Sequence, residues 1–587
     1  MSDLYSKASL VMNPQLVDTG KVYSIKPEDR KGDFTFTRSS AATRVNADGL
    51  VEKETQNLFL QSNSFNTGNW NYRAGDSATS GQSGYDGTND AWLLNVTTGG
   101  WSVYQNQNLT GVYTFSLYVK AGTIDVVQID FFSSGTTYSA QFNLTSGTDI
   151  GGNNTIDRTI TDIGSGWYRI SVSANVSSTL YTRIGSVSLT GNFYIQDAQL
   201  EQGLVARDYI ETTTTAVDGG ITDNVPRLDY TDSSCPSLLL EPSRTNSIKQ
   251  SEYINGWNFL SNVNVIDNAA TSPEGVLNAS KIIPTTAAGS QKVLDVSGFN
   301  RTSGEYISHT IYAKASGYNY LYLSNSADRL FAVYDLSGGS VDYVSSNGTD
   351  FINHSASIES VGNGWYRCAL IGEAVTSIGS YLRVSVAPTS ETTSAPAYTA
   401  DGTSGILVYG AQVELNSSYA TSYIPTYGSS VTRVLETCQV EDEGALINSE
   451  QGALYFEGIA IDPSYASVMS FSDGTLTNRI CLTLPQNATN INAFSSVGGS
   501  KIDNYILHDP SVNSKYAIVW NGNSFKVFVN GVKKVDNTMA GSFSANTLTD
   551  IRFDRGDGAL NFEGFCKSYL SIATALTDQE AIDLTTI

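Results

Sequence analysis

The sequence is poor in cysteine, and its cysteines are dispersed. The five positions share no regular spacing and form no CxxC pair: Cys235, Cys368, Cys438, Cys481 and Cys566. An odd, scattered set excludes a disulfide framework and argues against a structural zinc site. We therefore expect the chain to fold in a reducing cytoplasm.

Positive charge is also scarce. Lys and Arg number 34 against 57 Asp and Glu, the formal net charge is −23, and charged residues make up only 16% of the chain, below the roughly 25% of typical soluble domains. No Lys/Arg cluster interrupts the acidic background, and a phosphate backbone would be repelled. Nucleic acid is excluded as a partner.

Long apolar runs are missing as well. No stretch approaches the about eighteen consecutive apolar residues of a membrane-spanning helix. The first twelve residues lack a basic region followed by an apolar one, and Asn13-Pro14 ends the run. We expect neither a secretory signal nor membrane insertion.

Residues typical of strands and tight turns are abundant. The chain has 52 Gly and 33 Tyr, and 40% of its residues are hydrophobic. Tyr and Thr suit pleated, half-buried surfaces, while Gly, Asn and Asp supply the corners between strands. The composition predicts an all-β protein, and the 587 residues predict roughly three or four domains.

The chain contains one long module twice. Three landmarks recur in the same order: Gly166-Trp167-Tyr168-Arg169 as Gly364-Trp365-Tyr366-Arg367, Ala198-Gln199-Leu200-Glu201 as Ala411-Gln412-Val413-Glu414, and Tyr118-Val119-Lys120-Ala121 as Tyr312-Ala313-Lys314-Ala315. Units of this length are whole domains rather than solenoid repeats. A duplicated domain places a binding surface twice, which favours adhesion or assembly over catalysis.

The duplication divides the chain into five segments. We predict a leader with a hairpin (1–55), a jelly-roll module 1 (56–215), a linker with a buried strand (216–244), a jelly-roll module 2 (245–431) and a C-terminal sandwich (440–587). The leader is too short for its own core, so we expect it to dock on a neighbouring domain or another subunit.

Local patterns support these segments. Phe34-Thr35-Phe36-Thr37 alternates as a strand does, and Asn46-Ala47-Asp48-Gly49 supplies a turn. The alternating runs on either side of Asn521-Gly522 predict a hairpin in the C-terminal sandwich. Thr577, followed three residues later by Glu580, predicts a capped terminal helix.

The leader and linker resemble bacteriophage virion proteins. The resemblance is carried by three stretches: Phe36-Thr37-Arg38-Ser39-Ser40-Ala41-Ala42-Thr43-Arg44-Val45-Asn46-Ala47-Asp48-Gly49-Leu50-Val51-Glu52, Pro226-Arg227-Leu228-Asp229-Tyr230 and Leu238-Leu239-Leu240-Glu241-Pro242-Ser243-Arg244-Thr245-Asn246. The modules resemble carbohydrate-binding jelly rolls, and the last domain is similar to concanavalin-like or laminin-G-like sandwiches, through Trp520-Asn521-Gly522-Asn523 and Val529-Asn530-Gly531.

The resemblance implies a component of the virion, as a fibre, tail or capsid-surface protein. It implies that the leader and linker anchor the protein to other virion proteins, while the modules and the C-terminal sandwich attach weakly and multivalently to host surface glycans. Exposed sandwich edges favour a homo-oligomer, with a trimer one possibility. A purely structural capsid decoration or tail component without glycan binding is the competing interpretation.

Aromatic residues in loops that differ between the copies are the candidate glycan ligands. They are Trp70, Tyr72, Tyr85, Trp101 and Tyr104 in module 1, and Trp257, Tyr318 and Tyr320 in module 2. Packing under loops is the alternative for each ring, because aromatic side chains bury large areas. Trp167 and Trp365 are predicted core anchors, with Arg169 and Arg367 pairing a carboxylate at the sheet edge.

No motif indicates catalysis or a cofactor. His309, His354 and His508 lack the spacing of a metal site or triad, and no Gly-x-Ser-x-Gly elbow occurs. Asp86-Gly87-Thr88-Asn89-Asp90 offers oxygens to calcium, but Pro273-Glu274-Gly275-Val276-Leu277-Asn278 stands at that point of module 2 and loses the pattern, which favours a plain turn. We predict a non-enzymatic protein without a metal. A polysaccharide-degrading enzyme stays open because two carboxylates are enough for that chemistry.

Overall fold

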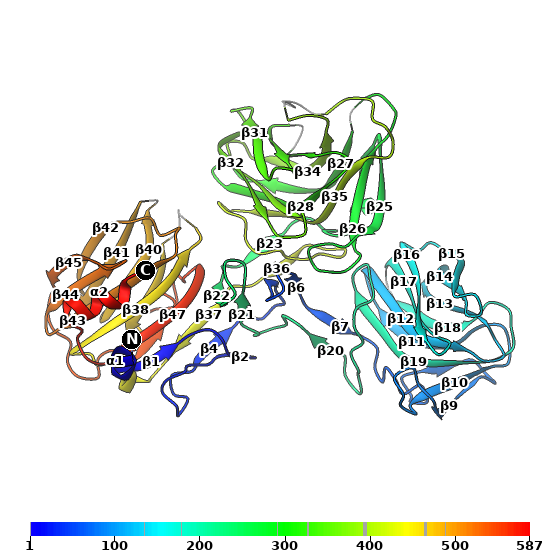
Figure 1. Cartoon of the computed structure of the whole chain (residues 1–587), viewed down its shortest axis with the longest axis horizontal. Helices are drawn as coiled ribbons and strands as arrows, with labels where there is room; N and C mark the ends of the chain where they lie inside the picture. Colours follow the sequence, from blue (N-terminus) through cyan, green and yellow to red (C-terminus); the bar gives the residue numbers. More distant parts are fainter. Residues whose placement is uncertain are drawn as a thin grey trace.

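The computed structural model shows three β-sandwich bodies around a central junction, and both chain ends lie in the same body (Figure 1). It describes residues 2–587 apart from 134, 178, 290, 326–327, 391–395, 463–465 and 488. Strands make up 54% of the chain and helices 3%. The described helical elements are α1 (Ser2–Lys7), α2 (Asp578–Thr585) and the 3-10 turns η1 (Ile254–Gly256) and η2 (Gly444–Leu446). None of these helices is long and apolar enough to cross a membrane. The all-β prediction is confirmed, with two tandem jelly rolls followed by a third β-sandwich.

Module 1 consists of two six-stranded antiparallel sheets, each named here after one strand. Phe115, Leu117 and Val119 of the β12 sheet share one core with Ile129 and Phe131 of the β13 sheet, and all five are fully buried. Every second residue points inward because successive side chains of a strand face opposite sides. The β12 sheet has the order β16 (Asp157–Gly164), β17 (Trp167–Val176), β12 (Gly111–Ala121), β19 (Gly191–Gln202), β10 (Ala91–Val96) and β9 (Ser77–Gln82), and the β13 sheet has the order β15 (Thr148–Asn153), β14 (Thr136–Asn143), β13 (Val126–Ser133), β18 (Thr179–Ser186), β11 (Gly100–Asn108) and β8 (Asn71–Tyr72).

Module 2 repeats this arrangement strand for strand. Tyr312 pairs with Arg367 as Tyr118 pairs with Arg169, and a bulge precedes each of these tyrosines on the opposite side of the strand. The β28 sheet has the order β25 (Val263–Ala270), β26 (Ala279–Pro284), β35 (Gly405–Leu415), β28 (Tyr306–Ser316), β33 (Tyr366–Ala374) and β32 (Phe351–Ser360), and the β29 sheet has the order β24 (Phe259–Ser261), β27 (Lys292–Arg301), β34 (Ile378–Ala387), β29 (Tyr320–Asn325), β30 (Leu330–Asp335) and β31 (Ser340–Ser346).

The C-terminal sandwich takes in strands from the leader and the linker. Leu10, Met12 and Phe34 of the leader and Leu238 and Leu240 of the linker belong to its core. Its eight-stranded sheet has the order β21 (Arg227–Asp229), β22 (Ser237–Leu240), β47 (Gly564–Ile572), β38 (Gln451–Ala460), β43 (Ser514–Asn521), β44 (Ser524–Val529) and β45 (Val532–Thr538), with β1 (Ala8–Met12) also on β47. Its nine-stranded sheet has the order β2 (Val17–Asp18), β3 (Lys21–Val22), β4 (Phe34–Thr37), β37 (Thr437–Val440), β46 (Asp550–Arg552), β39 (Ser467–Ser472), β40 (Arg479–Asn487), β41 (Asn490–Val497) and β42 (Ser500–Leu507). This sandwich therefore extends beyond 440–587.

Short paired strands connect the bodies. They are β5 (Arg44–Val45) with β6 (Val51–Glu52), β7 (Thr55–Asn57) with β20 (Val217–Gly219), and β23 (Arg244–Asn246) with β36 (Val431–Arg433). The β5–β6 hairpin turns at Asn46–Gly49, as the sequence predicts. The hairpin at Asn521-Gly522 is present, and Thr577 with Glu580 forms the predicted capping box of α2.

A buried ionic cluster joins the leader, the linker and the end of module 2. Arg38 donates to Glu436 at 2.8 Å, and Glu241 forms ion pairs with Arg227 at 2.7 Å and with Arg433 at 2.8 Å. All five side chains are at most 3% exposed. Burial alone would raise the pKa of Glu241, but Arg433 and Arg227 outweigh it and hold that pKa well below its usual range.

Three members of this cluster come from the stretches that resemble phage proteins. Arg38 belongs to the leader stretch, and Arg227 and Glu241 to the linker stretches. Removing one partner of such a cluster leaves an uncompensated buried charge, which is strongly destabilising. These buried side chains connect the leader, the linker and the segment that follows module 2.

A second buried cluster joins the two modules. Lys53 of the leader contacts Glu252 at 2.7 Å and Glu274 at 2.9 Å, and Arg207 of module 1 also contacts Glu274. The hydroxyl of Tyr427 donates to Glu252 at 2.9 Å, while its carbonyl accepts from the backbone amide of Val112 at 2.8 Å. These contacts fix the orientation of module 1 relative to module 2.

Candidate functional site

The repeated landmarks form one hydrogen-bonded latch in each module. The side-chain amide of Asn57 donates to the carbonyls of Ala198 and Ile210 at 3.0 and 2.7 Å. Asn246 makes the same bonds to Ala411 and Ile424, at 3.0 and 2.8 Å. The side-chain oxygens of Gln199 and Gln412 accept hydrogen bonds from the backbone amides of Ile210 and Ile424, respectively, both at 2.7 Å. The landmarks close the jelly rolls, so their repetition reflects folding rather than ligand binding.

The Gly-Trp-Tyr-Arg strands also serve the fold. Trp167 and Trp365 are 1% and 2% exposed, in keeping with their predicted role as anchors. Their arginines differ from expectation: Arg169 donates to the carbonyl of Arg207, and Arg367 to that of Thr421. The acceptor is a backbone carbonyl rather than a carboxylate, because the chain after the closing strand folds back across the sheet at this point.

Two of the candidate ligands lie inside the modules. Trp70 is 3% exposed and packs against Phe59 and Phe65, and Trp257 is 5% exposed within the module 2 core. Each indole nitrogen donates to a backbone carbonyl, of Gln61 and Gln250 respectively. Neither ring offers a face on which a sugar could stack, so neither belongs to a binding site.

Four further candidates are half-buried and engaged with neighbours. Tyr72 donates to the carbonyl of Phe65 at 2.5 Å. Tyr85 stacks on Tyr118, with ring centroids 3.9 Å apart, and donates to Asp197 at 2.8 Å. The other two, Tyr318 and Tyr320, pack against module 2 hydrophobic clusters. These four rings do not lie together on one surface.

The remaining candidates, Trp101 and Tyr104, lie together on the outer face of the β13 sheet. Their ring centroids are 5.4 Å apart, and Tyr104 lies 5.1 Å from Tyr181 of β18, which is 41% exposed. Phe132 of β13 follows, 6.2 Å from Tyr181. Four rings thus form a continuous strip across three neighbouring strands.

Polar side chains adjoin this strip. Arg183 lies 4.4 Å above the ring of Phe132 and donates to Asp130 at 2.6 Å. Gln128 donates to Asp130 at 2.7 Å, and Gln141 donates to Gln128 at 3.0 Å. Burial raises the pKa of Asp130 despite the opposing effect of Arg183. We call these eight residues the aromatic face: Trp101, Tyr104, Gln128, Asp130, Phe132, Gln141, Tyr181 and Arg183.

The aromatic face has the composition of a ligand site. Tyr181 is exposed and the other three rings are half-buried. Together they present apolar surface, and a few hydrogen-bonded polar groups beside them fix orientation. A pyranose ring matches this pattern, because its C–H faces are apolar and its rim carries hydroxyl groups.

The same face of module 2 is filled by its own side chains. By strand register, Tyr322, Phe331 and Val333 occupy the places of Gln128, Ser139 and Gln141. They form an apolar cluster and are 0%, 7% and 0% exposed. The module 2 cluster is therefore more buried than the aromatic face, although Tyr343, whose ring lies 5.7 Å from that of Phe331, is 38% exposed.

Sequence reasoning missed Tyr181, Phe132 and Arg183. A signal existed, since Tyr181-Thr182-Arg183 recurs as Tyr381-Leu382-Arg383 on the corresponding strand β34. The residues of this short repeat point outward from both strands, whereas the more prominent repeated motifs form the hydrogen-bonded latch.

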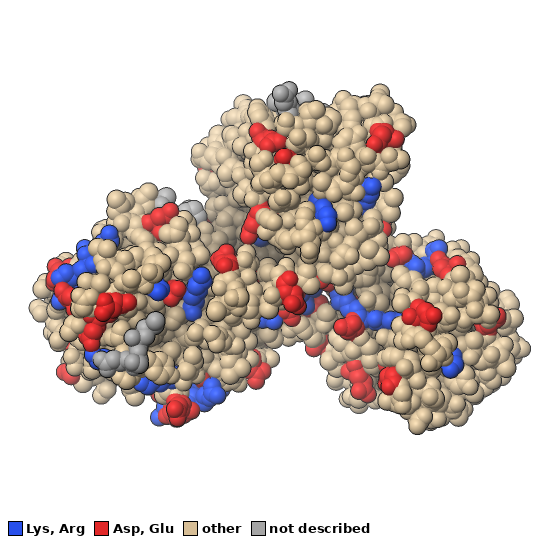
Figure 2. Space-filling view, viewed as in Figure 1, with Lys and Arg blue, Asp and Glu red and all other residues tan. Residues whose placement is uncertain are grey.

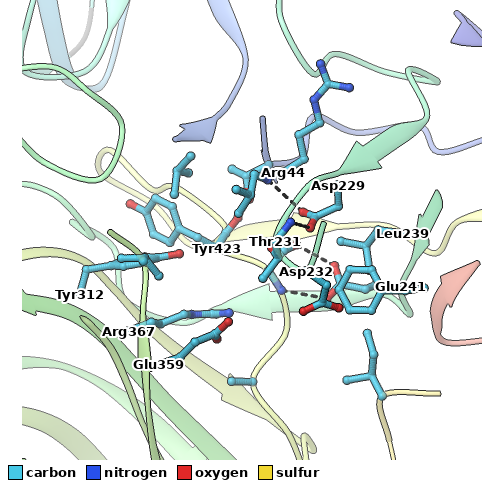
Figure 3. Close-up of a pocket in the computed structure, with 18 residues that line it drawn as sticks. Arg44, Asp229, Thr231, Asp232, Leu239, Glu241, Tyr312, Glu359, Arg367 and Tyr423 are labelled. Carbon is cyan, nitrogen blue, oxygen red and sulfur yellow. Dashed lines mark hydrogen bonds between the residues drawn. The ribbon is translucent and has the colours of Figure 1, made fainter. Parts of the chain in front are cut away.

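A pocket of about 260 Å³ lies at the junction, between the leader hairpin, the linker, module 2 and the C-terminal sandwich (Figure 3). Its main polar groups have internal partners. Asp229 accepts from the amides of Val45 and Thr231, both at 2.9 Å, and Glu241 belongs to the ionic cluster. The volume is below the about 300–1,000 Å³ of small-molecule sites, so we interpret the pocket as part of the junction.

The Asp86 segment forms a turn. The carboxylate of Asp86 accepts from the amide and hydroxyl of Thr88, at 3.1 and 2.7 Å. In the described part of the chain, no group of three or more His, Cys, Asp or Glu side chains is placed to hold a metal ion.

No family model and no curated protein matches the chain. Among solved structures, it is similar to the CBM40 carbohydrate-binding module of the Ruminococcus gnavus IT-sialidase bound to alpha2,3 sialyllactose, at 16% identity over 24% of this chain and 84% of that one, with a TM-score of 0.21. It is also similar to the N-terminal CBM22-1-CBM22-2 tandem domain of Xyn10C from Paenibacillus barcinonensis, at 11% identity over 61% of this chain and 96% of that one, with a TM-score of 0.20. At these TM-scores the likenesses identify no ligand for this chain.

Proposed function

We propose that this protein is a non-enzymatic bacteriophage virion component that attaches to host surface glycans through the aromatic face of module 1. The observation that carries the glycan-binding part is the strip of four rings, of which Tyr181 is 41% exposed, beside hydrogen-bonded amides and a guanidinium. The virion part rests on the resemblance of the leader and linker stretches, and it implies a protein made in the host cytoplasm and assembled into a particle.

The face supports weak binding by stacking and hydrogen bonding. Trp101 and Tyr181 offer rings to the C–H faces of successive sugars, while Arg183 and Gln141 offer polar atoms to hydroxyl groups. Because Tyr322, Phe331 and Val333 are buried at the equivalent place in module 2, we assign one such site to each chain. Multivalency then comes from many copies on one particle, as a homo-oligomer or an array, and raises avidity without new contacts.

The aromatic face does not suit glycan cleavage. A glycosidase uses two carboxyl groups on either side of the scissile bond. Asp130, the carboxylate beside the rings, is 1% exposed and paired with Arg183, so it is not free to act as an acid or a nucleophile.

Glycan-array binding by the full chain tests the proposal. We expect wild type to retain one or more surface oligosaccharides, and Tyr181→Ala to weaken that binding by about ten-fold, or about 1.4 kcal/mol. The matched control is Tyr381→Ala at the same position of module 2, which should bind as wild type does. A chain that binds no glycan at any concentration contradicts the proposal.

A purely structural role is the second candidate, and the junction favours it. Two buried ionic clusters fix the three bodies in one arrangement, as a particle component that serves as a rigid spacer requires. Under this alternative the folded chain decorates a capsid or tail, and Tyr181→Ala leaves every activity of the particle unchanged.

A further inference from the structure

We infer that the aromatic face selects uncharged glycans over acidic ones, an inference that rests on the proposed function. The charges on the face cancel. Arg183 and Asp130 form a 2.6 Å ion pair, and the amides of Gln128 and Gln141 are uncharged. At the edge of the strip, Arg73 lies 5.4 Å from the ring of Trp101 but is paired with Asp76.

An acidic sugar would be penalised at this place. Its carboxylate would lose water on stacking against the rings, and burying a charge is costly unless a counter-charge compensates it. Arg183, the cation nearest to the rings, is already paired with Asp130. The chain as a whole carries a net charge of −23, which adds a long-range repulsion of anionic polymers.

A hydroxyl group, in contrast, matches the polar atoms of the face. A hydroxyl both donates and accepts, whereas a carboxylate only accepts. The side-chain amide of Gln141 donates to Gln128, and that of Gln128 donates to Asp130. The side-chain carbonyl oxygen of Gln141 is therefore left as an acceptor at the end of this chain of hydrogen bonds. The guanidinium of Arg183 uses Nε for Asp130, and its other nitrogens can donate to a ligand.

Much of the visible surface of modules 1 and 2 carries no charged side chain, and charges are more frequent over the C-terminal sandwich (Figure 2).

The test compares neutral oligosaccharides with their carboxylated counterparts on the full chain by calorimetry or surface binding. The probes are lactose against sialyllactose, and hexose oligomers against the same oligomers oxidised to uronic acids. We expect the acidic member of each bound pair to bind at least about ten-fold more weakly, and the neutral member to be insensitive to salt. Equal or tighter binding of acidic members overturns the inference and leaves the proposed function standing. Binding of neither member overturns both.

Asp130→Asn tests the charge argument directly. The substitution keeps the size of the side chain and its bond to Gln128 but leaves Arg183 without its counter-charge. We expect the ratio of acidic to neutral binding to rise about ten-fold, with a salt dependence that wild type lacks. The matched control is Asp328→Asn, which removes one ion-pair partner of Arg383 in module 2 and should not change selectivity.

Thermal melting checks that both variants fold. If Asp130→Asn does not fold, the salt dependence of wild-type binding decides alone: neutral-glycan affinity that falls with salt contradicts an electroneutral site. An unchanged selectivity in a folded Asp130→Asn variant also contradicts the inference.

Discussion

Single buried side chains decide how each jelly roll closes. Asn57 is fully buried and makes four hydrogen bonds, two to carbonyls and two from the amides of Phe59 and Leu200 at 3.1 Å. Asn246 makes the corresponding four. An asparagine about 190 positions further along the chain thus closes module 2 with the same hydrogen bonds.

Asn57→Ala should destabilise module 1. The change leaves buried amides and carbonyls without partners, at about 1–3 kcal/mol for each group that stays dry. We expect a loss of about 3 kcal/mol or more, seen as a lowered transition in calorimetry. Asn246→Ala should lower a module 2 transition by a similar amount, and Asn106→Ala, at an exposed position, should do neither. Equal stability of Asn57→Ala and Asn106→Ala would contradict the latch.

Glu563→Gln should stabilise the protein in a pH-dependent way. Glu563 is 4% exposed, and burial raises its pKa to about 7, although it accepts from Tyr419 at 2.9 Å. In the unfolded chain its pKa is near 4.5, so folding becomes costlier as pH rises from about 4.5 through about 7. The gain from Gln should reach about 3 kcal/mol at pH 8 and vanish near pH 4. Melting curves at both pH values check this, and an equal gain at both would refute it.

Residue roles were predictable only in part. The burial of Trp167 and Trp365 follows from strand alternation. The sequence could not show that Trp70 is buried while Trp101 is half-exposed, because both follow turn residues and the difference depends on which neighbouring strand lies above each ring. Tyr181 was missed because its one sequence signal, the recurrence of Tyr181-Thr182-Arg183 as Tyr381-Leu382-Arg383, does not tell which side of the strand stays exposed once the sheet is assembled.

At the scale of elements, the leader contributes strands to a distant body. Strand β1 pairs with β47 near the other end of the chain, and Leu10 and Met12 are fully buried. Alternation predicted β4 and the Asn521-Gly522 hairpin. It could not predict the partners of β1 and β22, because pairing between strands hundreds of residues apart leaves no local pattern.

Leu10→Ala should destabilise the C-terminal sandwich and spare the modules. Removing a buried leucine side chain costs about 2–5 kcal/mol through lost burial and the cavity left behind. Calorimetry with limited proteolysis should show earlier loss of residues 440–587 and unchanged modules. Deletion of residues 1–12 should have a larger effect in the same direction. An unaffected C-terminal sandwich in both variants would mean that the leader is not part of this core.

At the scale of the whole molecule, the buried clusters make one rigid body of three sandwiches. Arg227 is fully buried and contacts both Glu241 and Glu436. The clusters combine charges from four separate segments, so no segment alone reveals them. The sequence shows the domains, therefore, but not their fixed arrangement.

Arg227→Met should loosen that arrangement. Loss of one partner from a buried ion cluster costs about 3–5 kcal/mol, and we expect small-angle scattering to show a larger maximum dimension and a wider spread of orientations. Arg158→Met, which removes a half-exposed pair with Asp149, is the control and should leave the scattering curve unchanged. Identical curves for the two variants would show that the cluster does not hold the bodies together.

The most direct test of glycan attachment is an experimental structure of the full chain with a bound oligosaccharide. We predict electron density for sugar rings stacked on Trp101 and Tyr181, with hydroxyl groups within hydrogen-bonding distance of Arg183 and Gln141, and none over Tyr322 of module 2. Sugar density in the junction pocket or on module 2, with the aromatic face empty, would contradict the account.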